Sequence, residues 1–194
     1  MTSDTHFLDQ AFPPEGLSSL ERDRIHQAFE QKVVEKEVYF LREGDIARTY
    51  WFMESGLARS FAIDVDGKEV TTDFFATGDI VIDWASLMLQ HPTREYIQAL
   101  EPCIVWEIDF ETFQELFHSI EGFREAGRTR LVKSYFVTKN HRVSMIVDQA
   151  KGRYLRMMKT QPEIIKRAPL KHIASYLGIT DTSLSRIRKE LTNK

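Results

Sequence analysis

Five side chains near the C-terminal end of the sequence carry groups that can bind nucleic acids. Their spacing would bring them together on one helix. Asp181, Ser185 and Lys189 are four residues apart, as are Thr182 and Arg186, so a helix would carry all five on one face. Their carboxylate, hydroxyl, amine and guanidinium groups can hydrogen-bond to base edges and to phosphates. The chemistry that this face predicts is recognition of double-stranded DNA.

Two short helices joined by a tight turn must position this face. The second helix can be capped by Thr180, and its other side is apolar at helical spacing. The first helix begins near Pro169, carries an apolar stripe at i, i+3, i+4 and i+7, and ends at Gly178. This order is typical of a helix-turn-helix, whose second helix enters the major groove. A plain helical hairpin with a solvated basic surface is the alternative interpretation.

The side chains of this module are expected to divide between bases and phosphates. Arg186 is the first candidate for base recognition, because a guanidinium can donate two hydrogen bonds to guanine O6 and N7. Asp181, Thr182 and Ser185 are secondary candidates. Contacts with phosphates, which position the protein without specifying sequence, are expected from five further residues: Thr180, Ser183, Arg188, Lys189 and Lys171.

The charge of the chain is divided between its two parts. The whole sequence has 26 Lys+Arg and 29 Asp+Glu, a formal net charge of −3. Residues 151–194 hold 11 of the basic side chains and only 3 of the acidic ones. A basic module on an acidic body would direct the module toward phosphates and keep the body away from them.

The composition excludes several other classes of protein. We expect a cytoplasmic protein, because the N-terminus lacks the features of a signal peptide and no apolar run is long enough to cross a bilayer. Cys103 is the single cysteine, so no internal disulfide can form, and we expect a buried thiol. No nucleophile–base pair, metal-ligand set or phosphate-binding loop is found in the sequence. We therefore expect neither an enzyme nor a metal site.

The first half of the chain has the pattern of a helix followed by short antiparallel strands. A capping box at residues 18–21 predicts a helix to about Glu30. From Val33 onward, glycine turns at 44, 56, 67 and 78 recur every 11 or 12 residues, which is typical of a sandwich or barrel. Asp66-Gly67 predicts a two-residue hairpin turn.

A less regular stretch, residues 81–93, comes next, and an insertion of this kind often carries a ligand site. Two more strands are predicted at 94–100 and 103–108. Asp109 can then cap a short helix with three aromatic residues along one side: Phe110, Phe113 and Phe117.

Residues 122–148 contain no proline, have only Gly127 to weaken a helix after the first residue, and predict one long helix. Two apolar seams run along it, which suits contact with its own β-domain on one side and with a second copy of the helix on the other. We therefore expect a homodimer; a single-chain helix lying over the sheet is the alternative. Gly152 is interpreted as a hinge or a helix stop before the C-terminal module.

The predicted fold class is α+β. An antiparallel β-roll, or jelly roll, is expected as a sensor domain at 1–121, followed by a long dimerisation helix and hinge at 122–150. A small all-α helix-turn-helix domain is expected at 151–194. It would lack a complete wing, because the sequence stops three residues after Leu191.

This order of elements resembles the Crp/Fnr family of bacterial transcription regulators. The similarity covers nearly the whole chain and is most specific in the turns REGD and ATGD and in the segment LGITDTSLSRIRKEL at 177–191. It implies a cyclic-nucleotide-binding-like sensor domain coupled through the long helix to the helix-turn-helix. It also implies a homodimer on a palindromic site in double-stranded DNA, a small-molecule effector, RNA polymerase as a protein partner, and no membrane. The alternative is a signalling adaptor that senses a cyclic nucleotide or metabolite and has lost DNA binding.

The resemblance also places the effector site. Cyclic-nucleotide binders of this fold carry Gly-Glu for the ribose and Arg-Ser-Ala for the cyclic phosphate, and here Ile82-Asp83 and Arg94-Glu95 stand at those positions. Thr138 matches a position that contacts the base. Ile82 would block the close approach of the ligand to the backbone, and Glu95 would place a negative charge beside the phosphate. We expect a pocket that is degenerate for cyclic AMP; the alternative is that a cyclic nucleotide still binds. No other cofactor is predicted.

Overall fold

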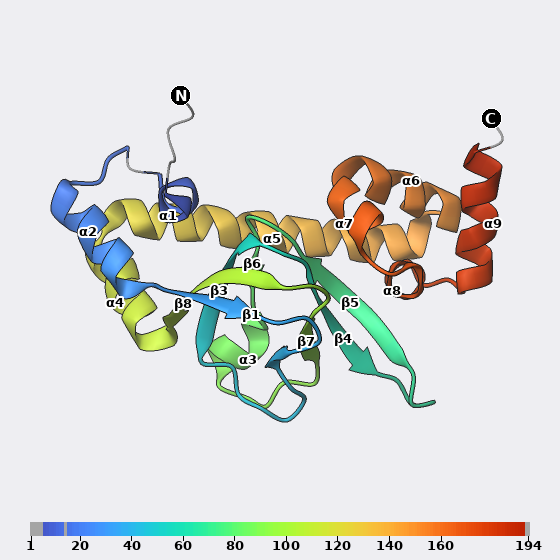
Figure 1. Cartoon of the computed structure of the whole chain (residues 1–194), viewed down its shortest axis with the longest axis horizontal. Helices are drawn as coiled ribbons and strands as arrows, with labels where there is room; N and C mark the ends of the chain where they lie inside the picture. The colour runs from blue at the N-terminus through green and yellow to red at the C-terminus, as the bar shows by residue number, and fades with distance from the viewer. Residues whose placement is uncertain (1–5, 14, 193–194) are drawn as a thin grey trace.

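The structure is a computed structural model that describes residues 6–13 and 15–192. One long helix, α5 (Glu121–Val147), runs along a β-sandwich, and a group of short helices lies at its C-terminal end (Figure 1). The strands are β1 (Glu30–Val34), β2 (Tyr39–Leu41), β3 (Thr49–Ser55), β4 (Ala58–Ile63), β5 (Glu69–Phe75), β6 (Ile80–Val81), β7 (Tyr96–Ala99) and β8 (Cys103–Asp109). The other helices are α1 (Phe7–Ala11), α2 (Ser19–Ala28), α3 (Trp84–Leu89), α4 (Phe110–Ser119), α6 (Ala150–Thr160), α7 (Pro162–Arg167), α8 (Leu170–Tyr176) and α9 (Asp181–Thr192).

The strands form two antiparallel sheets, in the orders β1-β8-β3-β6 and β2-β7-β4-β5. The predicted β4–β5 hairpin is confirmed, but its turn is longer than the two-residue turn predicted at Asp66-Gly67. Asp64 N donates to Lys68 O at 2.9 Å, so three residues form the loop, and Gly67 has a φ of +78°. The turn between β3 and β4 requires a glycine for a different reason. A Cβ on Gly56 would lie 2.7 Å from the Cα of Cys103, so only glycine allows this close approach of the two backbones.

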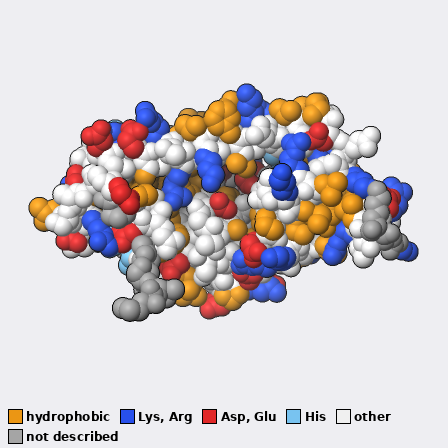
Figure 2. Space-filling model, turned by 90° about the horizontal axis from the view of Figure 1, so that it is seen from above, with side chains coloured by type: hydrophobic (Ala, Val, Ile, Leu, Met, Phe, Trp, Pro, Cys, Tyr) orange, Lys and Arg blue, Asp and Glu red, His pale blue; other side chains and the backbone are white. Residues whose placement is uncertain are grey.

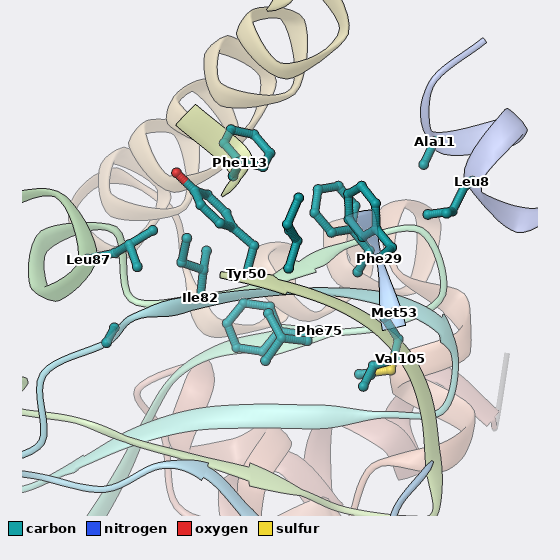
Figure 3. Close-up of a cluster of buried hydrophobic side chains, with 14 of the residues drawn as sticks. Leu8, Ala11, Phe29, Tyr50, Met53, Phe75, Ile82, Leu87, Val105 and Phe113 are labelled. Carbon is teal, nitrogen blue, oxygen red and sulfur yellow. The ribbon is translucent and has the colours of Figure 1, made fainter. Parts of the chain in front are cut away.

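The core of the sandwich is aromatic and aliphatic, and α5 closes it. Tyr50 from β3 stacks on Phe113 from α4 with ring centroids 4.0 Å apart (Figure 3). Phe123, from the first turn of α5, is fully buried and stacks on Phe12 at 4.3 Å. Cys103 is fully buried as a free thiol, as predicted. The start of α5 is therefore fixed to the sandwich by packing.

The predicted helix caps are confirmed. Ser18 and Glu21 form the capping box of α2, with Glu21 N donating to Ser18 Oγ and Ser18 N to Glu21 Oε2. Asp109 caps α4 by accepting a hydrogen bond of 2.9 Å from Thr112 N. The long helix predicted at 122–148 is α5, and the α+β class with two antiparallel sheets is confirmed.

The interpretation of Gly152 as a hinge or helix stop is wrong. Gly152 lies inside α6, and the break between α5 and α6 falls at Asp148 and Gln149, both in extended conformations. Arg153 stabilises this break, because its guanidinium donates to the carbonyl oxygen of Asp148 at 2.6 Å. Among the described residues no helix is long and apolar enough to cross a membrane.

Candidate nucleic-acid interface and sensor pocket

The turn between α8 and α9 is closed by backbone hydrogen bonds around one glycine. Gly178 has a φ of +64°, the left-handed region that glycine adopts without strain. Ile179 N donates to Ala174 O at 3.0 Å and Gly178 N donates to Ser175 O at 2.9 Å, the pair of bonds that defines a Schellman motif. This motif ends α8 and sets the direction in which α9 begins.

The N-terminus of α9 is capped by the residue that the sequence predicts. Thr180 Oγ1 accepts a hydrogen bond of 3.2 Å from Ser183 N and donates one of 3.0 Å to Ser183 Oγ. Both hydroxyls, predicted to contact phosphates, are thus used inside the helix cap. Asp181 stands in the first turn, where its negative charge complements the helix dipole.

Helix α9 has one apolar face and one polar face. Leu184 and Ile187 are buried in the core of the C-terminal module. The predicted DNA-binding face is exposed along its length: Asp181, Thr182, Ser185, Arg186, Arg188 and Lys189. Within the described part of the chain, the side chains of Arg186 and Lys189 form no ion pair. They are therefore available to an external partner, and Figure 2 shows basic side chains at this end of the molecule.

The C-terminal module is docked on its own β-sheet. Ser175 of α8 sits at the free edge of β5, where its Oγ accepts a hydrogen bond of 2.9 Å from Thr71 N. Lys171, also on α8 and exposed, is close enough to Glu69 to help lower the pKa of that carboxyl. An edge strand with unpaired amides is a template for aggregation, and here a helix covers it.

The sensor residues implied by the family resemblance are only partly brought together. Asp83 caps α3, and its other carboxylate oxygen accepts a hydrogen bond of 2.5 Å from Thr93 Oγ1. The same Thr93 hydroxyl accepts one of 3.0 Å from Glu95 N. Burial raises the pKa of Glu95, and the nearby Asp83 charge adds to this effect. Asp83 therefore has a structural role, and Glu95 is the half-buried carboxyl beside it.

The other implied residues lie elsewhere. Arg94 is exposed, and among the described residues its guanidinium forms no ion pair, so it makes no salt bridge to Asp83 or Glu95. Ile82 is 6% exposed and belongs to the core of the sandwich, where Figure 3 shows it beside Tyr50. Thr138 is an exposed residue of α5.

One polar residue of the sensor domain escaped the sequence analysis. Asp73 on β5 has its pKa raised to about 7 by burial, and the carboxylates of Asp79 and Glu95 act in the same direction. Ser60 and Thr72, whose hydroxyls are 2.7 Å apart, lie on the paired strands next to it. Strand β5 reads Glu-Val-Thr-Thr-Asp-Phe-Phe, without alternation of polar and apolar residues, so the sequence carries no periodic signal that marks Asp73.

Helix α5 exposes a row of apolar side chains in the single chain. Tyr135 and Phe136 contact each other edge to face at 5.7 Å, and both are more than half exposed. The row continues to the end of the helix: Leu131, Val132, Val143, Ile146 and Val147. Hydrophobic side chains also gather along one long edge of the space-filling view (Figure 2). An exposed apolar row of this length is typical of a surface that a partner covers.

Comparison with known proteins agrees with this architecture. The model of the cyclic nucleotide-binding domain matches residues 31–119. The chain is 25% identical over 193 residues to the anaerobic regulatory protein of Haemophilus influenzae, covering 93% of this chain and 74% of that protein. It is 31% identical over 119 residues to the fumarate and nitrate reduction regulatory protein of Yersinia pestis, covering 61% of this chain and 47% of that protein.

Solved structures share the fold over nearly the whole chain. The c-di-GMP responsive global regulator CLP of Xanthomonas campestris matches with a TM-score of 0.70 and 18% identity, covering 91% of this chain and 92% of that one. FixK2 from Bradyrhizobium japonicum matches with a TM-score of 0.69 and 17% identity, covering 85% of each chain. The long helix and the C-terminal helices are thus placed as in these structures.

Proposed function

Because this chain belongs to the Crp/Fnr family of DNA-binding transcription regulators, we propose that it acts as a homodimer whose two α9 helices enter successive major grooves of a palindromic site. The observation that carries this proposal is the exposed polar face of α9, positioned by the Schellman turn at Gly178. The exposed apolar row of α5 supports the dimer. A two-fold dimer would place its half-sites about 34 Å apart, one turn of the double helix.

Selection of bound sequences from a random pool of DNA duplexes tests the proposal. We expect the purified chain to enrich a two-fold symmetric sequence and to protect two half-sites about ten base pairs apart in a footprint. If no sequence is enriched while the protein is a folded dimer, the proposal is wrong and the signalling adaptor is favoured.

We further propose that the sensor pocket does not bind cyclic AMP. Three observations support this. Ile82 is packed in the core, Glu95 contributes a carboxyl where a phosphate would need a donor, and Arg94 is an exposed residue.

Calorimetric titration with cyclic AMP and cyclic GMP tests this second proposal. We expect no micromolar binding by the full chain. Micromolar binding that Arg94→Ala abolishes, and that the matched change of exposed Arg48→Ala leaves intact, would show that the pocket still functions.

A further inference from the structure

We propose that a cavity between the C-terminal half of α5 and the helices α6 and α8 binds a small organic acid, a carboxylate on a compact apolar body. Figure 1 shows α6 and α8 beside this part of α5. The cavity volume is about 270 Å³, slightly below the range of about 300–1,000 Å³ that is typical of drug-sized ligands. The residues that line it include none from the effector position implied by the family resemblance and none from the polar face of α9.

The wall that α5 contributes lies opposite the surface expected to form the dimer. Val137, His141 and Ser144 line the cavity, and their spacings of four and three residues place them on one side of the helix. Tyr135, of the exposed apolar row, precedes Ser144 by nine residues, and Ile146 follows Val137 by nine. Nine residues are roughly two and a half turns at about 3.6 residues per turn, so the two surfaces face in opposite directions. Dimerisation through the apolar row therefore leaves the cavity accessible.

Much of the cavity wall is apolar. Tyr176 of α8 is buried and stacks on His141, with ring centroids 4.2 Å apart and an angle of 11° between the planes. Met157 of α6 and Leu177, at the end of α8, are also buried and complete this part of the wall. A wall of this kind is stabilised when the apolar body of a ligand removes it from water, which a bare inorganic ion cannot do.

The charged side chains at the cavity are both arginines of α6. Arg153 and Arg156 line the cavity, and none of the described residues that line it is acidic. Arg153 donates through Nε and Nη2 to Leu177 O and through Nη1 to Asp148 O, so all three of its nitrogens are used within the chain. Arg156 donates only through Nη2, to Asp148 Oδ2 at 2.7 Å. Because a guanidinium has five N–H donors, Arg156 retains donors for a second carboxylate.

Two neutral polar side chains at the cavity are also available to a ligand. Within residues 6–13 and 15–192, the amide of Asn140 and the imidazole of His141 form no hydrogen bond. Burial and the charge of Arg153 lower the pKa of His141, so its ring is neutral at pH 7 and carries one N–H donor. One guanidinium and neutral donors balance a single negative charge, which favours a carboxylate over a phosphate dianion.

NMR titration of the isotope-labelled full-length protein tests the site with defined probes. The probes are benzoate, cyclohexanecarboxylate and isovalerate, each compared with its neutral amide and with inorganic phosphate. We expect at least one of the three carboxylates to shift the resonances of Asn140, His141 and Arg156 with a saturable dependence on concentration. It should bind at least about tenfold more tightly than its amide and than phosphate, because the amide lacks the charge and phosphate lacks the apolar body.

Three variants locate the bound carboxylate. Arg156→Gln should weaken binding at least about tenfold, because the free donors of the guanidinium are lost. Lys159→Gln removes the same charge from the same helix, but Lys159 does not line the cavity, so binding should be unchanged. Asp148→Asn breaks the same ion pair as Arg156→Gln but keeps the guanidinium, so binding should be retained or strengthened.

Several results would overturn the proposal. These are the absence of binding by all three carboxylates, equally tight binding of the amides or of phosphate, and shifts confined to the β-sandwich. Equal weakening in Asp148→Asn and Arg156→Gln would also overturn it, because Arg156 would then act only through its ion pair. If Arg156→Gln does not fold, the comparison of each acid with its amide in the wild type still decides the result. The titrations contain no DNA, so a failure of the proposed DNA binding does not alter them.

Discussion

At the scale of single residues, Arg186 and Lys189 lie on the same exposed face of α9 but are expected to act differently. A guanidinium can form two hydrogen bonds with guanine, whereas an amine near the end of the helix is suited to a phosphate. Arg186→Ala should lower the discrimination between the enriched site and its variants by about 1–3 kcal/mol. Lys189→Ala should weaken binding to all sequences alike and reduce the salt dependence by about one phosphate contact.

Competition binding against single-base variants of the site separates these roles. If the ranking of sequences is unchanged in Arg186→Ala, this residue does not recognise a base. Lys189→Ala serves as its control on the same helix.

The raised pKa of Asp73 makes a prediction about stability. Burial raises the pKa of this carboxyl to about 7 in the folded chain, compared with a pKa of 3.8 for an ordinary aspartate. The folded state therefore binds more protons between pH 4 and 7, so the free energy of unfolding falls as the pH rises through this range. Asp73→Asn should remove this decrease in the free energy of unfolding with pH. At pH 8 it should raise the free energy of unfolding by about 1–3 kcal/mol, and at pH 4 it should not raise it.

Urea denaturation of the two proteins at several pH values checks the effect of Asp73→Asn. Asp23→Asn, a change of an exposed aspartate on α2, is the control and should leave the pH profile unchanged. An identical pH dependence in wild type and Asp73→Asn would contradict the prediction.

Single residues also mark where sequence reasoning was sufficient. Thr180 and Gly178 act through bonds to residues within five positions, so their roles in cap and turn could be predicted from local sequence. The orientations of Arg94 and Asp73 depend on the register of paired strands and on what packs behind them. Sequence position alone therefore could not show that Arg94 is exposed or that Asp73 is partly buried.

At the scale of elements, α5 is expected to form the dimer through its exposed apolar row. Phe136 is 53% exposed in the single chain and lies near the middle of this row. Phe136→Glu would bury two carboxylates at a symmetric interface, which should weaken dimerisation by at least about 3 kcal/mol. The molar mass measured by light scattering after gel filtration should fall toward that of a monomer.

Leu20→Glu is the control for the α5 variant, because Leu20 is also exposed and apolar but lies on α2. This control should remain dimeric. A dimer that persists in Phe136→Glu at micromolar concentration would place the interface elsewhere.

The elements themselves were predictable where their patterns are long or their caps are strong. The 27 residues of α5 and the capping box of α2 are of this kind. The sequence analysis missed α1 and α3, which have five and six residues, because one helical turn carries too little periodicity. It misplaced the break before α6 because the decisive bond, from Arg153 to the carbonyl of Asp148, is made by the side chain of a residue that follows the break.

At the scale of the whole molecule, the docking of the C-terminal module was not predictable. The sequence indicates a basic module and an acidic body, but it does not indicate that they share a hydrophobic core. Phe74 and Leu57 have the pattern of ordinary strand and turn residues, and their burial under Tyr176 depends on tertiary structure. The molecule is therefore less modular than its division into a sensor, a helix and a DNA-binding domain implies.

The covered edge of β5 also has a consequence for synthesis on the ribosome. The amide of Thr71 is paired with the hydroxyl of a residue 104 positions later in the chain. At about 5–20 residues per second, that partner is translated roughly 5–20 s after the strand. During this interval the nascent sandwich presents an open strand edge and an uncovered Phe74, which favours pairing with other nascent chains. Helix α8 thus completes the β-sandwich, in addition to preceding the helix proposed to bind DNA.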